Sequence, residues 1–286
     1  MIAVNGKVID QNLFPDETPH LKFSPVDEAS WSDDQSDPIF NILWLYDRMS
    51  ELFNVICLVD KIRKCFQYRS YITLTIPYLP NARMDRCEKA DDVFTLETFS
   101  KLINQCNFDE VCTFDVHSDV SKSKIAKLYD ESPIIVVDKA ARILIEKFNV
   151  VDLHLFYPDK GAQHRYSNMF PDSPWASADK QRDWNTGKII GLEISEGSHR
   201  ISGNDFLIID DICSKGGTFY HAANKLKELG ANRVFLYVSH LERTVHDGLL
   251  LKEDSPIEHI FTTNSIYRWG SKNKITVINH WRYEYE

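Results

Sequence analysis

The alternation of short apolar runs with helical stretches is the feature that most constrains how this chain can fold. Residues 71–76 and 111–116 are mostly apolar or β-branched, which is typical of buried strands. Apolar residues recur at helical spacing over 41–53 and 96–103, which predicts two helices. Further strands are expected over 151–157, 188–194, 206–209 and 234–238, and further helices over 138–148 and 222–229. Because strands that alternate with helices form largely parallel sheets, the sequence predicts an α/β fold.

The same alternation occurs twice along the chain, which predicts two domains. A length of 286 residues suits one large or two ordinary domains. The pattern begins again near Ser132 and Pro133, so we expect an N-terminal domain over 1–133 and a C-terminal domain over 134–286. The stretch 166–186 is rich in polar residues and proline, and it is predicted to be a mobile loop.

Composition argues against several classes of protein. The chain has 33 basic and 42 acidic residues, whereas nonspecific nucleic-acid binders need clustered Lys and Arg to displace counterions. No run approaches the roughly 18 apolar residues of a membrane-spanning helix, and the first residues lack a signal-peptide pattern. Six scattered cysteines without C-x-x-C or zinc-ligand spacing are typical of a reducing compartment. We therefore expect a cytoplasmic protein that binds neither nucleic acid nor membrane, and no structural metal site.

The strongest local signal is an apolar strand that runs directly into two acids and a glycine-rich turn. The apolar run over 206–209 is followed by Asp210, Asp211, Ser214, Lys215, Gly216, Gly217 and Thr218. A turn that opens a helix beyond the carboxyl end of a parallel strand suits a phosphate group. The two acids would repel a phosphate but can accept hydrogen bonds from sugar hydroxyls. The segment predicts a ribose-phosphate site, the alternative being an ordinary buried strand followed by a capped helix.

This segment resembles the phosphoribosyl-diphosphate loop of type I phosphoribosyltransferases and ribose-phosphate pyrophosphokinases. Two further motifs favour the pyrophosphokinases: residues 77–86, P-Y-L-P-N-A-R-M-D-R, resemble P-Y-x-x-Y-A-R-Q-D-R, and 114–118, F-D-V-H-S, resemble D-L-H. Residues 14–18, 158–161 and 180–182 fall where that family has F-x-D-G-E-T, P-D-x-G-G and the K-x-R of its catalytic flexible loop. The order of these motifs is far more specific than any one of them.

The resemblance implies two tandem type I phosphoribosyltransferase-like domains, each a largely parallel sheet flanked by helices. It implies a Mg²⁺-dependent enzyme that moves the β,γ-diphosphate of ATP to the anomeric hydroxyl of a ribose 5-phosphate and releases AMP. The N-terminal domain would bind ATP and the C-terminal domain the ribose phosphate, with the active site between them.

The family's functional residues carry over onto matching positions of this chain. The catalytic residues would be Arg83, His117, Lys180 and Arg182. The ATP-binding residues would be Phe14, Asp16, Glu17, Arg83, Asp85, Arg86 and His117. The ribose phosphate would contact Asp159, Asp210, Asp211, Ser214, Lys215, Gly216, Gly217 and Thr218, and the metal Asp115, His117 and Asp159. By the same analogy, Phe14, Asp16 and Glu17 reach the adenine of ATP in a neighbouring subunit, which implies a homo-oligomer of at least two chains.

The 5-phosphate loop departs from the family pattern D-D-x-x-D-T-x-G-T. Ser214 replaces the third acid and Lys215 replaces the threonine that follows it. The exchange removes one negative charge and adds one positive charge beside the phosphate of the acceptor. It fits tighter binding of ribose 5-phosphate, and it also fits a larger anionic group at the ribose 5-position. Relatives in phages are understood to act on ADP-ribose for NAD rebuilding, so both acceptors stay open.

Two other functions are alternatives. A phosphoribosyltransferase that consumes phosphoribosyl diphosphate would not need the phosphate-binding residues Arg83 and His117 in an N-terminal domain. A non-catalytic regulatory relative would be expected to lack the loop cations, yet Lys180 and Arg182 are present.

Overall fold

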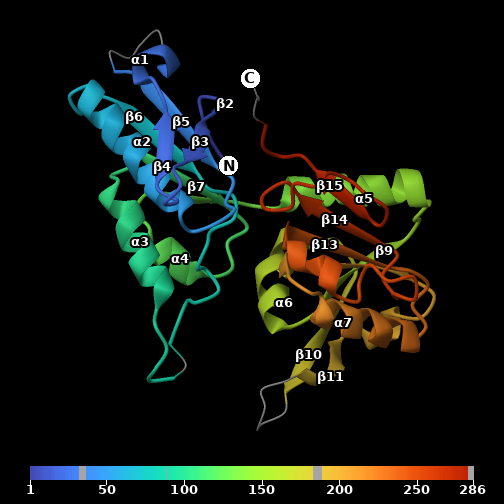
Figure 1. Cartoon of the computed structure of the whole chain (residues 1–286). Coiled ribbons are helices and arrows are strands. Elements are labelled where there is room, and N and C mark those ends of the chain that lie inside the picture. The colour runs from blue at the N-terminus through green and yellow to red at the C-terminus, as the bar shows by residue number, and fades with distance from the viewer. Residues whose placement is uncertain (32–36, 88, 183–188, 283–286) are drawn as a thin grey trace. The chain divides into compact units, whose positions relative to one another are not determined.

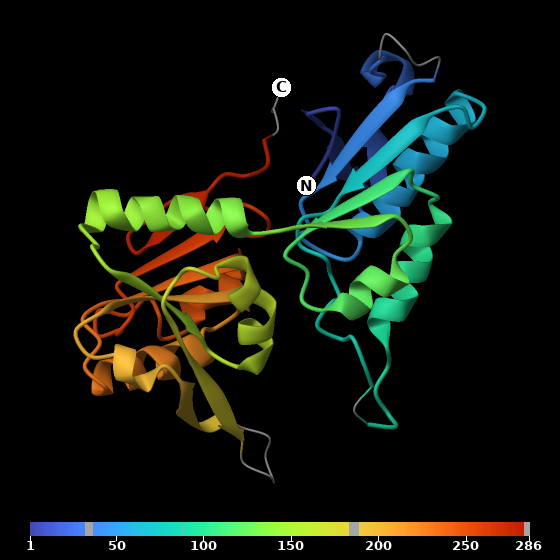
Figure 2. The same cartoon turned by 180° about the vertical axis from the view of Figure 1, so that it is seen from behind.

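The computed structural model describes residues 1–31, 37–87, 89–182 and 189–282. The chain forms two compact units: Met1–Ser132 together with Trp281–Glu286, and Pro133–His280. Each unit contains a sheet with helices packed against it, as Figures 1 and 2 show from opposite sides. No helix among the described residues is both long enough and apolar enough to cross a membrane.

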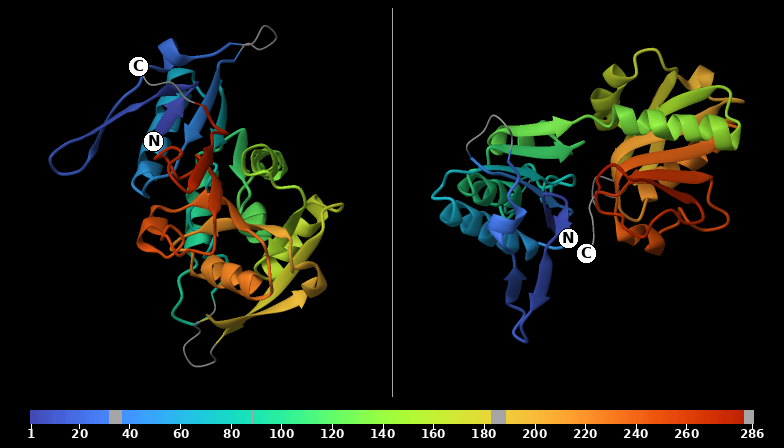
Figure 3. Two further views of the ribbon diagram at one scale, coloured as in Figure 1. Left: turned by 90° about the vertical axis from the view of Figure 1, so that its right-hand side faces the viewer. Right: turned by 90° about the horizontal axis from the view of Figure 1, so that it is seen from above.

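The first unit is built on a sheet of order β2-β1-β5-β6-β7-β8. Its strands are β1 (Ile2–Val4), β2 (Lys7–Val8), β5 (Ile39–Trp44), β6 (Tyr71–Thr75), β7 (Glu110–Phe114) and β8 (Leu128–Glu131). Its helices are α1 (Pro25–Glu28), α2 (Glu51–Cys65), α3 (Thr95–Gln105) and α4 (Asp119–Lys124). Strands β5 to β8 are parallel, while β1 is antiparallel to β5 and β2 is antiparallel to β1. A separate hairpin of β3 (Asp10–Leu13) and β4 (Pro19–Lys22) extends from this unit (Figure 3).

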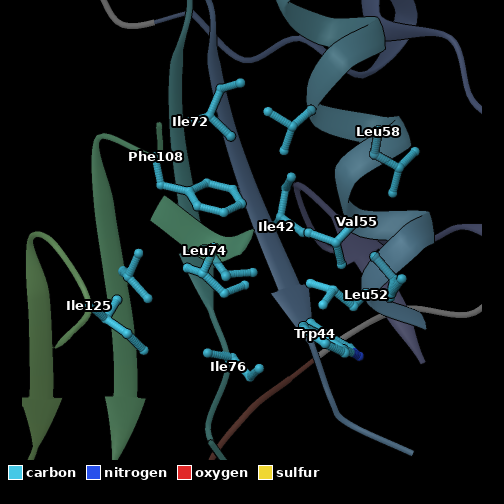
Figure 4. Packing of buried hydrophobic residues seen from close by; sticks show 14 of the residues in the cluster. Ile42, Trp44, Leu52, Val55, Leu58, Ile72, Leu74, Ile76, Phe108 and Ile125 are labelled. Carbon is cyan, nitrogen blue, oxygen red and sulfur yellow. The ribbon is translucent and has the colours of Figure 1, made fainter. Parts of the chain in front are cut away.

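Apolar side chains between the sheet and α2 form the core of the first unit. Ile42, Trp44 and Leu74 point from β5 and β6 toward the face of α2 that carries Val55 and Leu58 (Figure 4). All five side chains are at most 2% exposed, so nearly their whole apolar surface is removed from water. This burial holds the sheet and α2 together.

The second unit has a sheet of order β11-β10-β9-β12-β13-β14-β15. Its strands are β9 (Leu153–Tyr157), β10 (Trp175–Arg182), β11 (Ile189–Glu196), β12 (Asp205–Cys213), β13 (Val234–Leu241), β14 (His259–Thr263) and β15 (Ile275–Ile278). Its α-helices are α5 (Ile134–Phe148), α6 (Lys160–Tyr166) and α7 (Gly217–Glu228), and short 3-10 helices cover η1 (Ser167–Met169), η2 (Ser198–Arg200) and η3 (Arg243–Asp247). All neighbouring strands are parallel except β10 and β11. Two largely parallel sheets flanked by helices confirm the predicted α/β class.

Two local predictions are wrong. The helix expected over 41–53 is instead the end of β5 followed by a turn and the start of α2, because Ile42 and Trp44 lie in a strand between β1 and β6. The predicted loop over 166–186 contains β10, which pairs with β9 through Trp175 and with β11 through Lys180. Residues 183–188 lie outside the described part of the chain.

The structure also differs from the predicted domain division at the end of the chain. Trp281 was assigned to the C-terminal domain, but it belongs to the first compact unit. Its indole ring packs edge-on against Phe114 at a centroid distance of 5.1 Å. An aromatic contact of this kind stabilises the end of the chain on the first unit.

Candidate active site

The acid pair of the second unit lies inside β12, not beyond its end. The predicted strand over 206–209 continues to Cys213, because β13 keeps pairing with it as far as Cys213 and Leu241. Asp211 is 3% exposed, whereas Asp210 keeps part of its surface accessible. The carboxyl end of a central parallel strand therefore carries two adjacent carboxyl groups, one buried and one partly accessible.

The two carboxyl groups differ in their surroundings. Asp211 Oδ1 lies 3.1 Å from Nη1 of Arg165, which gives this carboxylate a cationic partner. Asp210 Oδ1 accepts a hydrogen bond from the backbone N–H of Asp211 at 3.0 Å. The pKa of Asp210 is raised well above its usual value, first by removal from water, then by the charges of Asp211 and Asp159, and Arg165 offsets part of the rise. Both carboxyl groups can accept hydrogen bonds from sugar hydroxyls.

Arg165 is a residue that the sequence reasoning missed. It lies in α6, the helix that follows β9, and β9 is the parallel neighbour of β12. Its guanidinium carbon is 5.5 Å from the ring centre of Tyr166, and its Nη1 donates a hydrogen bond to the Tyr166 hydroxyl at 3.3 Å. The only sequence signal for this role is that Arg165 lies in a short helix, α6, and nothing local links that helix to the acids of β12.

Asp159 caps the N-terminus of α6. Its Oδ1 accepts a hydrogen bond from the backbone N–H of Ala162 at 2.9 Å. A Cβ atom at Gly161 would lie 3.1 Å from the same oxygen, so the glycine leaves room for the cap. Asp159 therefore has one oxygen engaged in the helix cap, and its charge acts on Asp210.

The predicted 5-phosphate loop forms the turn between β12 and α7. Gly216 has φ 78° and ψ 17°, and a Cβ at this position would lie 2.2 Å from Leu250 Cδ1, so only glycine fits. An added Cβ at Gly217 would meet nothing within 4 Å, which leaves this backbone open to a ligand. The first turn of α7 has backbone N–H groups without helical partners, and these suit a phosphate. Lys215 is exposed and Thr218 is half-buried in the same turn.

The motif residues of the first unit gather at the carboxyl edge of its sheet. The segments 77–86 and 115–117 follow β6 and β7, which are parallel neighbours. The carbonyl oxygen of Pro77 accepts hydrogen bonds from Phe114 N at 3.1 Å and from Thr113 Oγ1 at 3.3 Å, which joins the two segments.

The candidate side chains on these two segments differ in exposure. Arg83 is exposed and His117 is partly exposed, while Asp115 is 3% exposed with φ 47°. Arg86 Nε lies 3.7 Å from Asp85 Oδ1, and the Arg86 side chain is 75% exposed. The edge therefore presents cationic side chains that an anion can reach.

The predicted adenine-binding residues lie at the turn of the β3–β4 hairpin. Asp16 Oδ1 accepts hydrogen bonds from Thr18 N and Thr18 Oγ1 at 3.1 and 2.7 Å, and these bonds lower the pKa of Asp16. Glu17 has φ 65°, a left-handed conformation that accommodates the turn without the glycine of the family pattern. Phe14 is 51% exposed and stacks on His20 at 5.1 Å. The turn is ordered by its own contacts and presents its aromatic residue at the surface.

Lys180 and Arg182 lie on β10, and their side chains are outside the described part of the structure. Asp115 and His117 belong to the first unit and Asp159 to the second. Within the described ranges no three His, Cys, Asp or Glu side chains come together as a metal cage.

The chain was compared with families and with curated proteins of known sequence. No protein-family model matches the chain. Ribose-phosphate pyrophosphokinases from Sulfurisphaera tokodaii, Vibrio cholerae and Shewanella oneidensis are 28%, 30% and 32% identical to it. The alignments cover 73%, 68% and 68% of this chain and 69%, 61% and 61% of the three relatives. The chain belongs to the ribose-phosphate pyrophosphokinase family.

A solved structure extends the family assignment to the fold. Phosphoribosylpyrophosphate synthetase from Mycobacterium smegmatis superposes with a TM-score of 0.71 at 17% sequence identity. The superposition covers 95% of this chain and 86% of that structure. The predicted pair of tandem type I phosphoribosyltransferase-like domains is thereby confirmed.

Proposed function

We propose that the protein is a Mg²⁺-dependent diphosphotransferase that moves the β,γ-diphosphate of ATP to the anomeric hydroxyl of a ribose 5-phosphate group. One observation carries the proposal: the partly accessible Asp210 and the buried Asp211 stand shortly before a turn in which Gly216 opens α7. The acids suit sugar hydroxyls, and the turn suits the 5-phosphate. The family's pyrophosphokinases supply the class of reaction, and the exposed cations of the first unit fit the phosphates of ATP.

The proposed reaction forms one bond and breaks one bond. The anomeric oxygen bonds to the β-phosphorus of ATP, and the bond from that phosphorus to the α,β-bridging oxygen breaks. The bridging oxygen leaves with AMP, and the hydroxyl proton is released. Because the transferred group is already activated, the protein contributes mainly positioning and stabilisation of developing charge.

The residues of the second unit orient the acceptor in this proposal. Asp210 and Asp211 hold the ribose hydroxyls, and the ion pair with Arg165 fixes the position of Asp211. The backbone of 214–218 holds the 5-phosphate. Lys180 and Arg182, on β10, neutralise the charge that develops on the departing AMP and exclude water from the diphosphate.

The residues of the first unit bind ATP. Arg83 and Arg86 can pair with phosphate oxygens, and a guanidinium does so with two parallel hydrogen bonds. Asp115 and His117 are proposed as Mg²⁺ ligands on the first unit, and Asp159 is proposed as one on the second. The ion would supply neutralisation of phosphate charge when bound. The hairpin residues Phe14, Asp16 and Glu17 would contact the adenine of ATP bound to a second copy, so the proposal includes a homo-oligomer of at least two chains.

The acceptor is ribose 5-phosphate, which would give phosphoribosyl diphosphate, or ADP-ribose, which would give ADP-ribose pyrophosphate for NAD salvage. The test is AMP release from ATP and Mg²⁺ with each acceptor in turn. We expect AMP only when an acceptor is present. If neither acceptor yields AMP, the proposal is overturned, and a phosphoribosyltransferase or a non-catalytic relative is favoured.

A further inference from the structure

A pocket on the second unit has no part in the reaction described above. Its volume is about 430 Å³, and its lining consists of Arg243, Thr244, His246, Asp247 and Trp269. The first four residues lie in η3, just after β13, and Trp269 comes from the segment between β14 and β15. The volume falls within the range typical of small-molecule sites.

The pocket adjoins the proposed 5-phosphate loop. Thr244 Oγ1, in the pocket lining, lies 2.8 Å from Ser214 Oγ in the loop. Gly248 packs so closely on the loop that an added Cβ would lie 2.0 Å from the carbonyl oxygen of Lys215. The two segments are therefore in direct contact, so the pocket lies beside the proposed 5-phosphate loop.

The pocket wall combines an accessible aromatic ring with a cation. Trp269 is 48% exposed, and the guanidinium carbon of Arg243 lies 5.5 Å from its ring centre. Tyr267 is fully buried and meets the Trp269 ring at 5.2 Å, and its hydroxyl lies 3.2 Å from His246 Nε2. The tryptophan is thus held from behind by a packed tyrosine while much of its surface faces solvent.

These groups match the chemistry of a nucleotide. The exposed part of the indole offers a stacking surface for a nucleobase, and Arg243, which lies over the same ring, offers hydrogen bonds to a phosphate. Lys215 adds a second cation where the two segments meet, and Asp247 adds an acceptor for a hydroxyl or amino group. Ribose 5-phosphate alone would fill only the loop and would leave the pocket unused.

We propose that this pocket binds a nucleotide attached to the 5-phosphate of the acceptor, so that the acceptor is a ribose joined through its phosphate to a nucleoside monophosphate. The nucleobase stacks on Trp269, and the outer phosphate contacts Arg243 and Lys215. This inference rests on the proposed function, because it takes the turn over 214–218 as the 5-phosphate site.

Binding measurements on the full chain test the pocket. ADP-ribose and ribose 5-phosphate are titrated calorimetrically into the wild type and into Trp269→Ala and Arg243→Ala, with Mg²⁺ and without ATP. We expect Trp269→Ala to weaken ADP-ribose binding by about 5- to 150-fold, the range of a lost base–aromatic stack, and to change ribose 5-phosphate binding less than about twofold. Trp269→Phe should restore much of the affinity.

A matched control uses Trp31→Ala, which removes an exposed tryptophan from the first unit. It should leave the affinity for both acceptors unchanged. Equal losses for both acceptors in Trp269→Ala, or no loss for ADP-ribose in either pocket variant, would overturn the pocket assignment.

AMP release measured on the same samples separates this inference from the proposed function. If ADP-ribose binds in a Trp269-dependent way but neither acceptor yields AMP, the pocket stands and the reaction fails. If ribose 5-phosphate yields AMP while Trp269→Ala and Arg243→Ala leave ADP-ribose binding and turnover unchanged, the reaction stands and the pocket fails.

Discussion

The carboxyl edges of the two sheets share one architecture but hold their charged groups differently. In the second unit, Asp211 is 3% exposed and pairs with Arg165 at 3.1 Å. In the first unit, Arg83 is exposed, and Arg86, whose side chain is 75% exposed, lies 3.7 Å from Asp85, whose side chain is 15% exposed. A buried pair is fixed because breaking it leaves an uncompensated charge, whereas an exposed pair exchanges readily with another ion.

Under the proposed function, this difference would let one architecture bind two kinds of substrate. A buried and prearranged acid pair suits the neutral hydroxyls of a sugar, which need exact orientation. Accessible cations on loops suit a flexible polyanion such as a nucleoside triphosphate. The predictions below test this division of roles.

The largest expected effect is on turnover, and it distinguishes Lys180 of the second unit from Arg83 of the first. Lys180→Ala should lower kcat about 10³-fold or more and leave the affinity for ATP within about twofold, because this cation acts on charge that develops during transfer. Arg83→Ala should mainly raise the dissociation constant for ATP. The measurements are steady-state turnover and ATP binding by calorimetry. Lys160→Ala, which removes an exposed lysine paired with Asp179, serves as the control. Undiminished turnover in Lys180→Ala would remove Lys180 from the catalytic set.

The next prediction compares the loss of stability when the Arg165–Asp211 pair or the Arg86–Asp85 pair is broken. Asp211→Asn leaves Arg165 without its carboxylate and should lower the free energy of unfolding by about 3 kcal/mol. Asp85→Asn should change it by less than about 1 kcal/mol, because Arg86 is 75% exposed. Urea unfolding followed by circular dichroism measures both. Similar losses in the two variants would contradict the contrast between the edges.

A smaller effect on stability concerns the turn proposed to hold the 5-phosphate. Gly216→Ala places a Cβ against Leu250 in a left-handed backbone and should destabilise the fold by about 1–2 kcal/mol or more. Gly217→Ala has open space at the same turn and should cost less stability. The melting temperatures of the two variants give the comparison, and equal values would show that Leu250 does not restrict this turn.

The smallest effect is the pH dependence of stability at Asp210. Its pKa is raised in the folded protein, so its contribution to stability is greatest below the ordinary carboxyl pKa near 3.8 and is lost as pH rises through the folded pKa. Asp210→Asn should therefore be more stable than the wild type at neutral pH, and the difference should shrink as pH falls toward 4. The free energy of unfolding of both proteins is measured by denaturation at several pH values, in EDTA and without substrates. A difference that is constant with pH would show that Asp210 does not titrate in this way.

Much of the fold followed from local patterns in the sequence. The strands over 71–76 and 206–209 were predictable because runs of apolar and β-branched residues have few other stable arrangements. The strand β10 was missed because Ala176 and Ala178 are fully buried yet small, and polar residues between and after them concealed the pattern. The helix expected over 41–53 failed because a strand and a helix adjoin there, and their combined apolar positions imitate one helix.

The candidate site was predictable only where its residues are neighbours in sequence. The acids and glycines over 210–218 form one continuous motif, so their association needed no tertiary information. The motifs over 77–86 and 114–118 could be assigned to neighbouring loops because both follow strands of one parallel sheet. The roles of these residues stay predictions.

The sequence by itself determined the α/β class, the order of the motifs and the acid-then-glycine turn, because each depends on residues within about one strand and one turn of each other. Only the tertiary structure decided which distant groups meet. The contact of Arg165 with Asp211 and that of Thr244 with Ser214 join segments separated by 46 and 30 residues. Parallel pairing of β9, β12 and β13 brings these segments to one edge, and no local pattern encodes which side chains then lie within hydrogen-bond distance.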